Sequence, residues 1–196
     1  MLVRPELQKN ITSALAKQHL TKTMPENRIA IGVSSCLLGH KIRYDGNDKL
    51  NSIVENVICT RFHCIPLCPE YAIGLGVPRD PVQLIKSGET IRVLGVKNQA
   101  RDITVMLQQY ADFITSALPQ IRGYVFKARS PSCGLVDTPI FDKNNQEITT
   151  GRGGYARQIT YRNSAMPVID EINLTDPARQ AEFIQAVEIY SLVCKR

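Results

Sequence analysis

Short apolar runs alternate with helical patterns along most of the chain. Residues 28–34 (RIAIGVS) form a continuous apolar run with the length and β-branching of a buried strand. Similar runs predict four further strands, at 62–67, 90–94, 123–127 and 166–169. Apolar residues spaced three and four apart predict helices at 48–58, 100–118 and 175–193. Strands that alternate with helices favour a parallel sheet covered on both faces.

The first 27 residues are predicted to form a helical extension. Leu7, Ile11 and Leu15 recur every four residues as a narrow apolar stripe, and the pattern ends before Met24-Pro25. We expect this helix to pack on its own domain, with partner binding as the alternative. The predicted organisation is therefore an extension (1–27) followed by a single α/β domain (28–196). We expect this domain to be a Rossmann-like three-layer sandwich with a mainly parallel sheet.

Composition narrows the class of protein. Hydrophobic residues make up 43% of the 196 residues and charged residues 21%, which predicts a packed core rather than disorder. The sequence has no apolar stretch as long as a membrane span, and its start does not resemble a signal peptide. We therefore expect a cytoplasmic protein with no membrane partner. The net charge of +6 lies mostly at the two ends, in residues 1–28 and at Lys195-Arg196, which weakens a nucleic-acid interpretation.

Six cysteines, at positions 36, 59, 64, 68, 133 and 194, pose the main chemical question. In a reducing cytoplasm we expect no disulfide framework. Cys59 and Cys194 lie at the ends of predicted helices, and Cys64 lies within a predicted strand. For these three we expect ordinary core or surface positions, because free cysteine is often buried as a small hydrophobe.

The other three cysteines each follow a predicted strand. Cys36, Cys68 and Cys133 come just after the runs at 28–34, 62–67 and 123–127. The carboxyl ends of parallel strands meet at one edge of the sheet, where open α/β sheets bind ligands. Three convergent thiolates suit a [4Fe–4S] cluster in which one iron has no protein ligand and acts as a Lewis acid. The alternative for each of them is again a buried core cysteine.

Five segments give the sequence a recognisable pattern. They are SSCLLG (34–39), RYDG (43–46), PLCPE (66–70), IGLGVPR (73–79) and KARSPSCG (127–134). In this order, and over about residues 28–170, the sequence resembles the thiouracil desulfidase (TudS) family. The resemblance implies a [4Fe–4S] cluster bound by Cys36, Cys68 and Cys133. It also implies removal of sulfur from a small thiolated base or nucleoside, such as 2- or 4-thiouracil.

The expected reaction is a hydrolytic exchange of sulfur for oxygen that releases sulfide without net redox change. It needs a proton acceptor for water and a proton donor to the base. Glu70, two residues after Cys68, is the candidate acid/base, and Ser130 is the candidate residue that orients substrate or water. The resemblance supports both roles. Residues expected to bind substrate are Ser34, Arg43, Arg129 and Ser132.

Basic residues near strand ends predict a local positive lining that could hold a nucleotide phosphate. They are Arg79, Lys127, Arg129 and Arg152. Asp45 is expected to have a structural role in a turn. We interpret Gly74-x-Gly76 and Gly151-x-Gly153-Gly154 as flexible loops. Neither is expected to follow a strand and open a helix, so the sequence predicts no dinucleotide cofactor.

Other functions remain open at this point. One is sulfur transfer on the same scaffold. Another is a nucleotide- or RNA-binding module, suggested by the sequence pI of about 9.1. A structural zinc site would need His40 or His63 as a fourth ligand. A thiol-redox enzyme is disfavoured because the sequence has no Cys-x-x-Cys. The sequence does not indicate an oligomeric state.

Overall fold

The computed structural model describes residue 13 and residues 28–194. The helical extension predicted for 1–27 therefore lies outside the described residues, apart from Ser13. Within the part of the chain that is described, no helix is long and apolar enough to cross a membrane.

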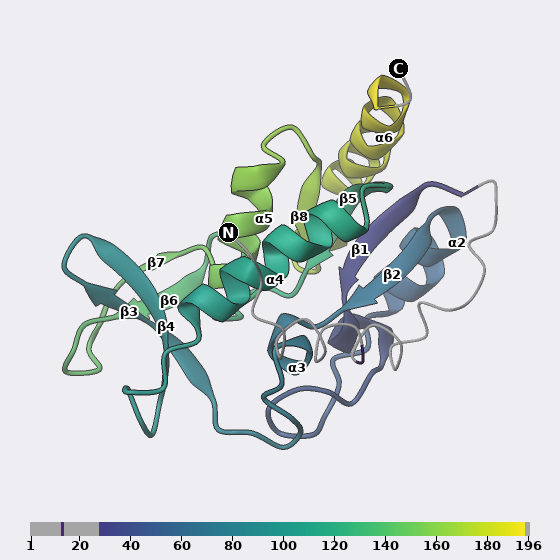
Figure 1. Ribbon diagram of the computed structural model, residues 1–196. Helices are drawn as coiled ribbons and strands as arrows, with labels where there is room; N and C mark the ends of the chain where they lie inside the picture. Colours follow the sequence, from purple (N-terminus) through teal and green to yellow (C-terminus); the bar gives the residue numbers. More distant parts are fainter. Residues whose placement is uncertain (1–12, 14–27, 195–196) are drawn as a thin grey trace.

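Four parallel strands form the main sheet (Figure 1). Their order is β2-β1-β5-β8, with β1 at Ala30–Ser34, β2 at His63–Leu67, β5 at Ile121–Phe126 and β8 at Val168–Asp170. All four correspond to predicted strands. Their apolar character follows from position, because a parallel strand covered on both faces presents no side to water.

Alternate residues of β5 show how the two faces of this sheet are covered. Tyr124 and Phe126 pack in one core cluster with residues of α4 (Thr104–Ala117) and α5 (Gly154–Arg162). Val125 packs in a second cluster with residues of α6 (Pro177–Val193) and of the helix at 54–61. Figure 1 shows α4 in front of the sheet and α6 behind it. The Rossmann-like three-layer arrangement itself stays a prediction.

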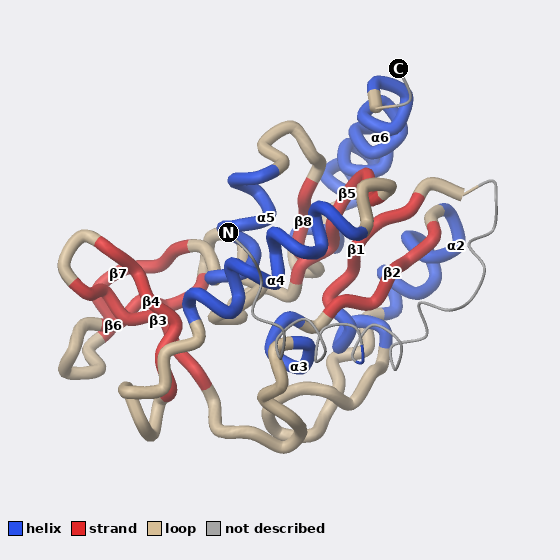
Figure 2. The backbone as a smooth tube through the Cα atoms, viewed as in Figure 1, coloured by secondary structure: helices blue, strands red, loops and turns tan. Residues whose placement is uncertain are grey.

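A second, mixed sheet was not expected from the sequence. Its order is β4-β3-β6-β7, with β3 at Val82–Ser87, β4 at Thr90–Gly95, β6 at Thr138–Phe141 and β7 at Glu147–Gly151. Figure 2 shows this sheet beside the parallel one. The run at 90–94 does form a strand, β4, but the prediction that it belongs to the parallel sheet is wrong. It pairs antiparallel with β3 across a tight turn at Gly88, whose φ is 60°.

One helix prediction and one loop prediction are also corrected. Residues 48–51 are not helical; the Asn51 side chain accepts a hydrogen bond from the Val54 amide (3.0 Å), as a residue before a helix does. The helix that follows Asn51 includes a π-helical turn (Val54–Ile58) and α2 (Cys59–Arg61). The segment Gly151-x-Gly153-Gly154 does lie between a strand, β7, and a helix, α5, contrary to the expectation of a flexible loop.

The expectation that the cysteines form no disulfide is wrong for one pair. Cys59 and Cys64 form a disulfide. The helix ends at Arg61 and the chain turns directly into β2 at His63, which brings the two Cα atoms to 5.5 Å. Cys36, Cys68, Cys133 and Cys194 are free thiols.

An ion pair between α4 and α5 allows a first prediction. Asp112 accepts hydrogen bonds from Arg162 (2.7 and 3.0 Å) and Gln158 (2.8 Å), and the Arg162 contact lowers the pKa of Asp112. Asp112→Asn should lower the free energy of unfolding near neutral pH by about 1 kcal/mol at most, because the pair is partly exposed.

This effect should depend on pH in a defined direction. A carboxyl whose pKa is lowered by folding stabilises the fold above its ordinary pKa, and the stabilisation is lost as pH falls through the lowered value. Urea unfolding of wild type and Asp112→Asn at about pH 7 and about pH 3 tests this. A stability difference that does not shrink in acid would contradict the assignment.

Candidate functional site

Three free thiols lie at the carboxyl edge of the parallel sheet. Cys36 follows β1 in a 3₁₀ turn (Ser35–Leu38), Cys68 directly follows β2, and Cys133 follows β5 through the loop 127–134. All three line one cavity of about 280 Å³. The strands position these residues because parallel strands end side by side, although the three segments are far apart in the sequence.

Burial makes these thiols weak acids in the protein without metal. It raises the pKa of Cys68 to about 12, with the Glu70 carboxylate adding to the effect. It also raises the pKa of Cys36, while Arg43 and Lys127 act in the opposite direction. Burial raises the pKa of Cys133 too, and a hydrogen bond from Ser34 opposes this. A metal centre held by these three residues would replace the thiol protons, since a coordinating thiol is deprotonated.

The loop that carries Cys133 is held from two sides. Ser130 Oγ accepts hydrogen bonds from the amides of Ser132 (3.3 Å) and Cys133 (3.1 Å). The first turn of α5 donates the Tyr155 amide to the Ser132 carbonyl oxygen (3.0 Å). Gly153 allows this approach, because a Cβ there would lie 2.6 Å from the Ser132 carbonyl carbon. The glycines that looked like a flexible loop therefore fix the position of Cys133.

Glu70 faces the same cavity with its carboxylate held at both oxygens. Oε1 accepts a hydrogen bond from Ser132 Oγ (2.8 Å), and Oε2 pairs with Arg79 Nε (2.8 Å). The Arg79 side chain is only 4% exposed and also donates to the carbonyl oxygens of Ile42 and Gly76 (2.9 Å each). The carboxylate is thus an acceptor with a fixed orientation beside Cys68.

The other predicted substrate-binding residues are placed differently from one another. Ser34 lines the cavity and its Oγ accepts the Lys127 amide (3.0 Å). Arg43 lines the cavity as well, with Nε 3.4 Å from Asp45 Oδ1 and its guanidinium 5.4 Å from the Tyr44 ring centre. Ser132 is fully buried and contacts Glu70 instead.

Two of the predicted basic residues turn away from the cavity. The Arg129 side chain is 74% exposed and pairs with Asp137 (3.3 Å), although Arg129 borders the cavity through the loop. Arg152 donates to the Leu135 carbonyl oxygen and to Thr160, which ties its own loop to α5. Asp45 accepts the Asn47 amide (3.1 Å), in agreement with the structural role expected for it.

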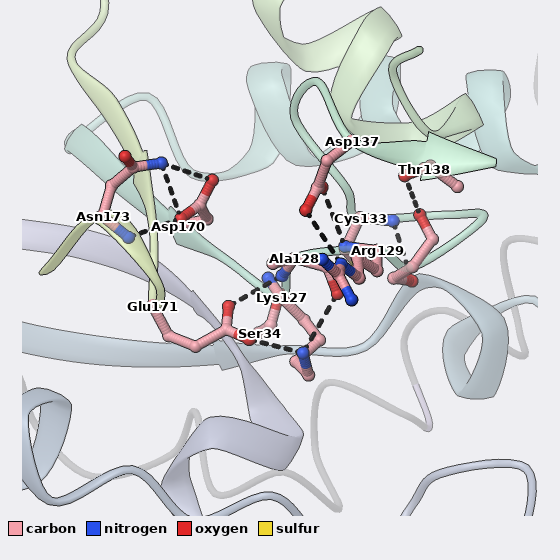
Figure 3. A network of polar contacts seen from close by, with 11 residues as sticks. Ser34, Lys127, Ala128, Arg129, Cys133, Asp137, Thr138, Asp170, Glu171 and Asn173 are labelled. Atoms are coloured by element: carbon pink, nitrogen blue, oxygen red, sulfur yellow. Dashed lines mark hydrogen bonds and ion pairs between the residues drawn. The ribbon is translucent and has the colours of Figure 1, made fainter. Parts of the chain in front are cut away.

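Sequence reasoning missed Glu171, which lies at the end of β8 (Figure 3). Its Oε2 accepts the Ala128 amide (2.7 Å), and its Oε1 pairs with the Lys127 ammonium. The signal was available, because Glu171 follows a predicted strand just as the three cysteines do. The rule applied to the thiols applies equally to this carboxylate.

Among residues 28–194, no group of three or more His, Cys, Asp or Glu side chains is placed to hold a single metal ion. His63, one candidate for a fourth zinc ligand, is the first residue of β2, whereas Cys68 follows the last. An iron–sulfur cluster makes a different demand, because each cysteine binds a different iron. Three separate thiols around one cavity fit that demand.

The fold and the site together define an α/β protein with a cysteine-lined cavity and an adjacent fixed carboxylate, the arrangement of a metal-cluster enzyme. The chain belongs to the 2-thiouracil desulfurase family, whose model matches residues 31–171. This places it among the desulfidase-like enzymes and confirms the resemblance found in the sequence.

Two known proteins are similar to the chain. One is a solved structure of thiouracil desulfidase TudS, described as [4Fe-4S]-dependent, with 27% identity and a TM-score of 0.60. The alignment covers 82% of this chain and 98% of that one. The other is the uncharacterized protein YbbK of Bacillus subtilis, 28% identical over 108 residues, or 52% of this chain and 71% of YbbK.

Proposed function

We propose that the protein removes sulfur from thiolated pyrimidines such as 2- or 4-thiouracil by hydrolytic exchange, releasing sulfide. Cys36, Cys68 and Cys133 would hold a [4Fe–4S] cluster with one iron free of protein ligands. The observation that carries this proposal is the shared cavity: three free thiols and the Glu70 carboxylate line it together. The cytoplasm as location and a free base or nucleoside as substrate belong to the same proposal.

The donor set fits such a cluster in charge as well as in number. Arg43, Arg79 and Lys127 line the cavity and would offset the negative charge of three thiolates. Ser34 adds a hydrogen bond to the Cys133 sulfur. A cluster bound there would supply a Lewis-acidic iron for the thiocarbonyl sulfur of the substrate.

Glu70 is proposed as the acid/base. Its carboxylate oxygens have spare lone pairs beside the bonds to Ser132 and Arg79, so it can accept a proton from water as the water oxygen bonds to the ring carbon. The carbon–sulfur bond then breaks and sulfur leaves as hydrosulfide. Oxygen replaces sulfur and no electrons are transferred. Ser132 is a positioning residue in this scheme, because it reaches the substrate only through Glu70.

Ser130 and Arg43 are proposed to orient the substrate. Both recorded contacts of Ser130 Oγ use its lone pairs, so they do not consume the hydroxyl hydrogen, which can donate into the cavity. The Arg43 guanidinium can hold a carbonyl oxygen or an anionic substituent. Arg129 stays a proposed substrate-binding residue, and it would have to leave Asp137 to act.

The test is an anaerobic preparation of the full chain. A broad absorption band at about 400 nm, with about four iron and four labile sulfide per chain, should accompany conversion of 4-thiouracil to uracil and free sulfide. A colourless protein that resists reconstitution would refute the cluster. A cluster-loaded protein that releases no free sulfide from thiouracil would refute hydrolytic desulfidation.

A further inference from the structure

A largely buried ion pair, Lys127–Glu171, lies at the carboxyl edge of the parallel sheet and has no role in the proposed acid/base chemistry. Lys127 is the first residue after β5, and Glu171 is the first residue after β8. Figure 3 shows the two side chains meeting between the neighbouring strand ends. The side chain of Lys127 is 20% exposed and that of Glu171 11%. Burying such a pair is costly unless its geometry is well satisfied, so its position calls for a reason.

The two members of this ion pair differ in how many of their hydrogen-bonding groups are used within the protein. Glu171 uses both carboxylate oxygens within the protein, on the Lys127 ammonium and on the Ala128 amide. Within the described residues, two acceptors contact Lys127 Nζ, namely Glu171 Oε1 and the Ala128 carbonyl oxygen (3.0 Å). An ammonium has three N–H donors, so one stays available.

The two members of the pair differ in their relation to the cavity. Lys127 is among the residues that line the cavity, and Glu171 is not. The charge of Lys127 also acts on Cys36, which lines the same cavity. Glu171 therefore fixes a positive hydrogen-bond donor beside the place where the substrate would react.

We propose that Lys127 is a further substrate-binding residue, which donates its third N–H to the carbonyl oxygen that remains in a thiouracil ring. Glu171 is the positioning residue that holds this ammonium. The inference rests on the proposed function, and it narrows the substrate class to thiolated pyrimidines with a second ring carbonyl.

The first test uses the wild-type protein and two substrates. 4-Thiouracil carries the second carbonyl oxygen, and pyrimidine-4-thione lacks it. A hydrogen bond from a charged donor predicts a preference of roughly 10- to 100-fold in kcat/KM for 4-thiouracil. Equal values for the two substrates would overturn the inference. Absence of turnover with both, in cluster-loaded protein, would instead refute the proposed function.

The second test removes the donor. In protein matched for iron content, Lys127→Met should raise the KM for 4-thiouracil roughly 10- to 100-fold. It should also lose the preference over pyrimidine-4-thione, whereas Lys127→Arg should recover part of it. Lys143→Met, at an exposed lysine between β6 and β7, is the matched control. A Lys127→Met protein that keeps both the wild-type KM and the preference would disprove the assignment.

Discussion

Replacing Cys36, Cys68 or Cys133 by serine is expected to lower the iron content far below the wild-type value of about four iron atoms per chain. A hydroxyl is a poor ligand for the irons of such a cluster, which are normally held by thiolates. Another thiol of the site cannot readily replace a lost ligand, because each of the three thiols comes from a different strand end. Iron and sulfide assays with the visible spectrum measure the effect directly.

The chain supplies its own controls for this experiment. Cys194→Ser makes the same chemical change at an exposed cysteine directly after α6, and should keep the iron. The double variant Cys59→Ala/Cys64→Ala removes the disulfide and should also keep the iron. If Cys36→Ser, Cys68→Ser or Cys133→Ser retained a full complement of iron, the proposed ligand set would be wrong.

Replacing Glu70 by Gln should reduce the turnover of thiouracil by about 10²- to 10⁴-fold while the iron content stays the same. Gln keeps the shape of the side chain and can still accept from Ser132, but it loses the charge that lets Glu70 take a proton from water. The predicted loss is in kcat, because the change affects the reaction more than the binding of a neutral base.

The second effect of this substitution is on stability and must be measured alongside. Arg79 is 4% exposed, so Glu70→Gln leaves a buried guanidinium without its counter-charge. The melting temperature should fall, and turnover should be compared well below it. Glu188→Gln, which breaks the exposed pair with Arg61, is the matched control and should change neither turnover nor iron content. Unchanged turnover in Glu70→Gln would eliminate Glu70 as the acid/base.

The parallel sheet was predictable because its strands are buried on both faces. Such strands are continuous apolar runs, as at Ala30–Ser34, and their carboxyl ends place any ligand site at one edge. The second sheet was harder to predict. β7 (Glu147–Gly151) is polar and mostly exposed, and β6 contains Pro139, so neither has the pattern of a core strand.

The position of the site followed from the same reasoning, but its internal arrangement did not. Local sequence places a residue at a strand end without fixing the direction of its side chain. Arg129 adopts a left-handed conformation (φ 56°) and its side chain pairs with Asp137, away from the thiols. Ser132 points at Glu70 rather than into the cavity. Both directions are set by how the loop 127–134 packs against α5 and β6.

The sequence by itself determined the parallel strands, the three cysteines at their ends and the carboxylate beside Cys68. These depend on short-range pattern and on a general property of parallel sheets. Tertiary structure alone decided that Arg79 holds Glu70, that Glu171 holds Lys127 and that Gly153 lets α5 fix the Cys133 loop. Each of these contacts joins segments whose approach is set by packing across the whole domain, and no local pattern encodes it.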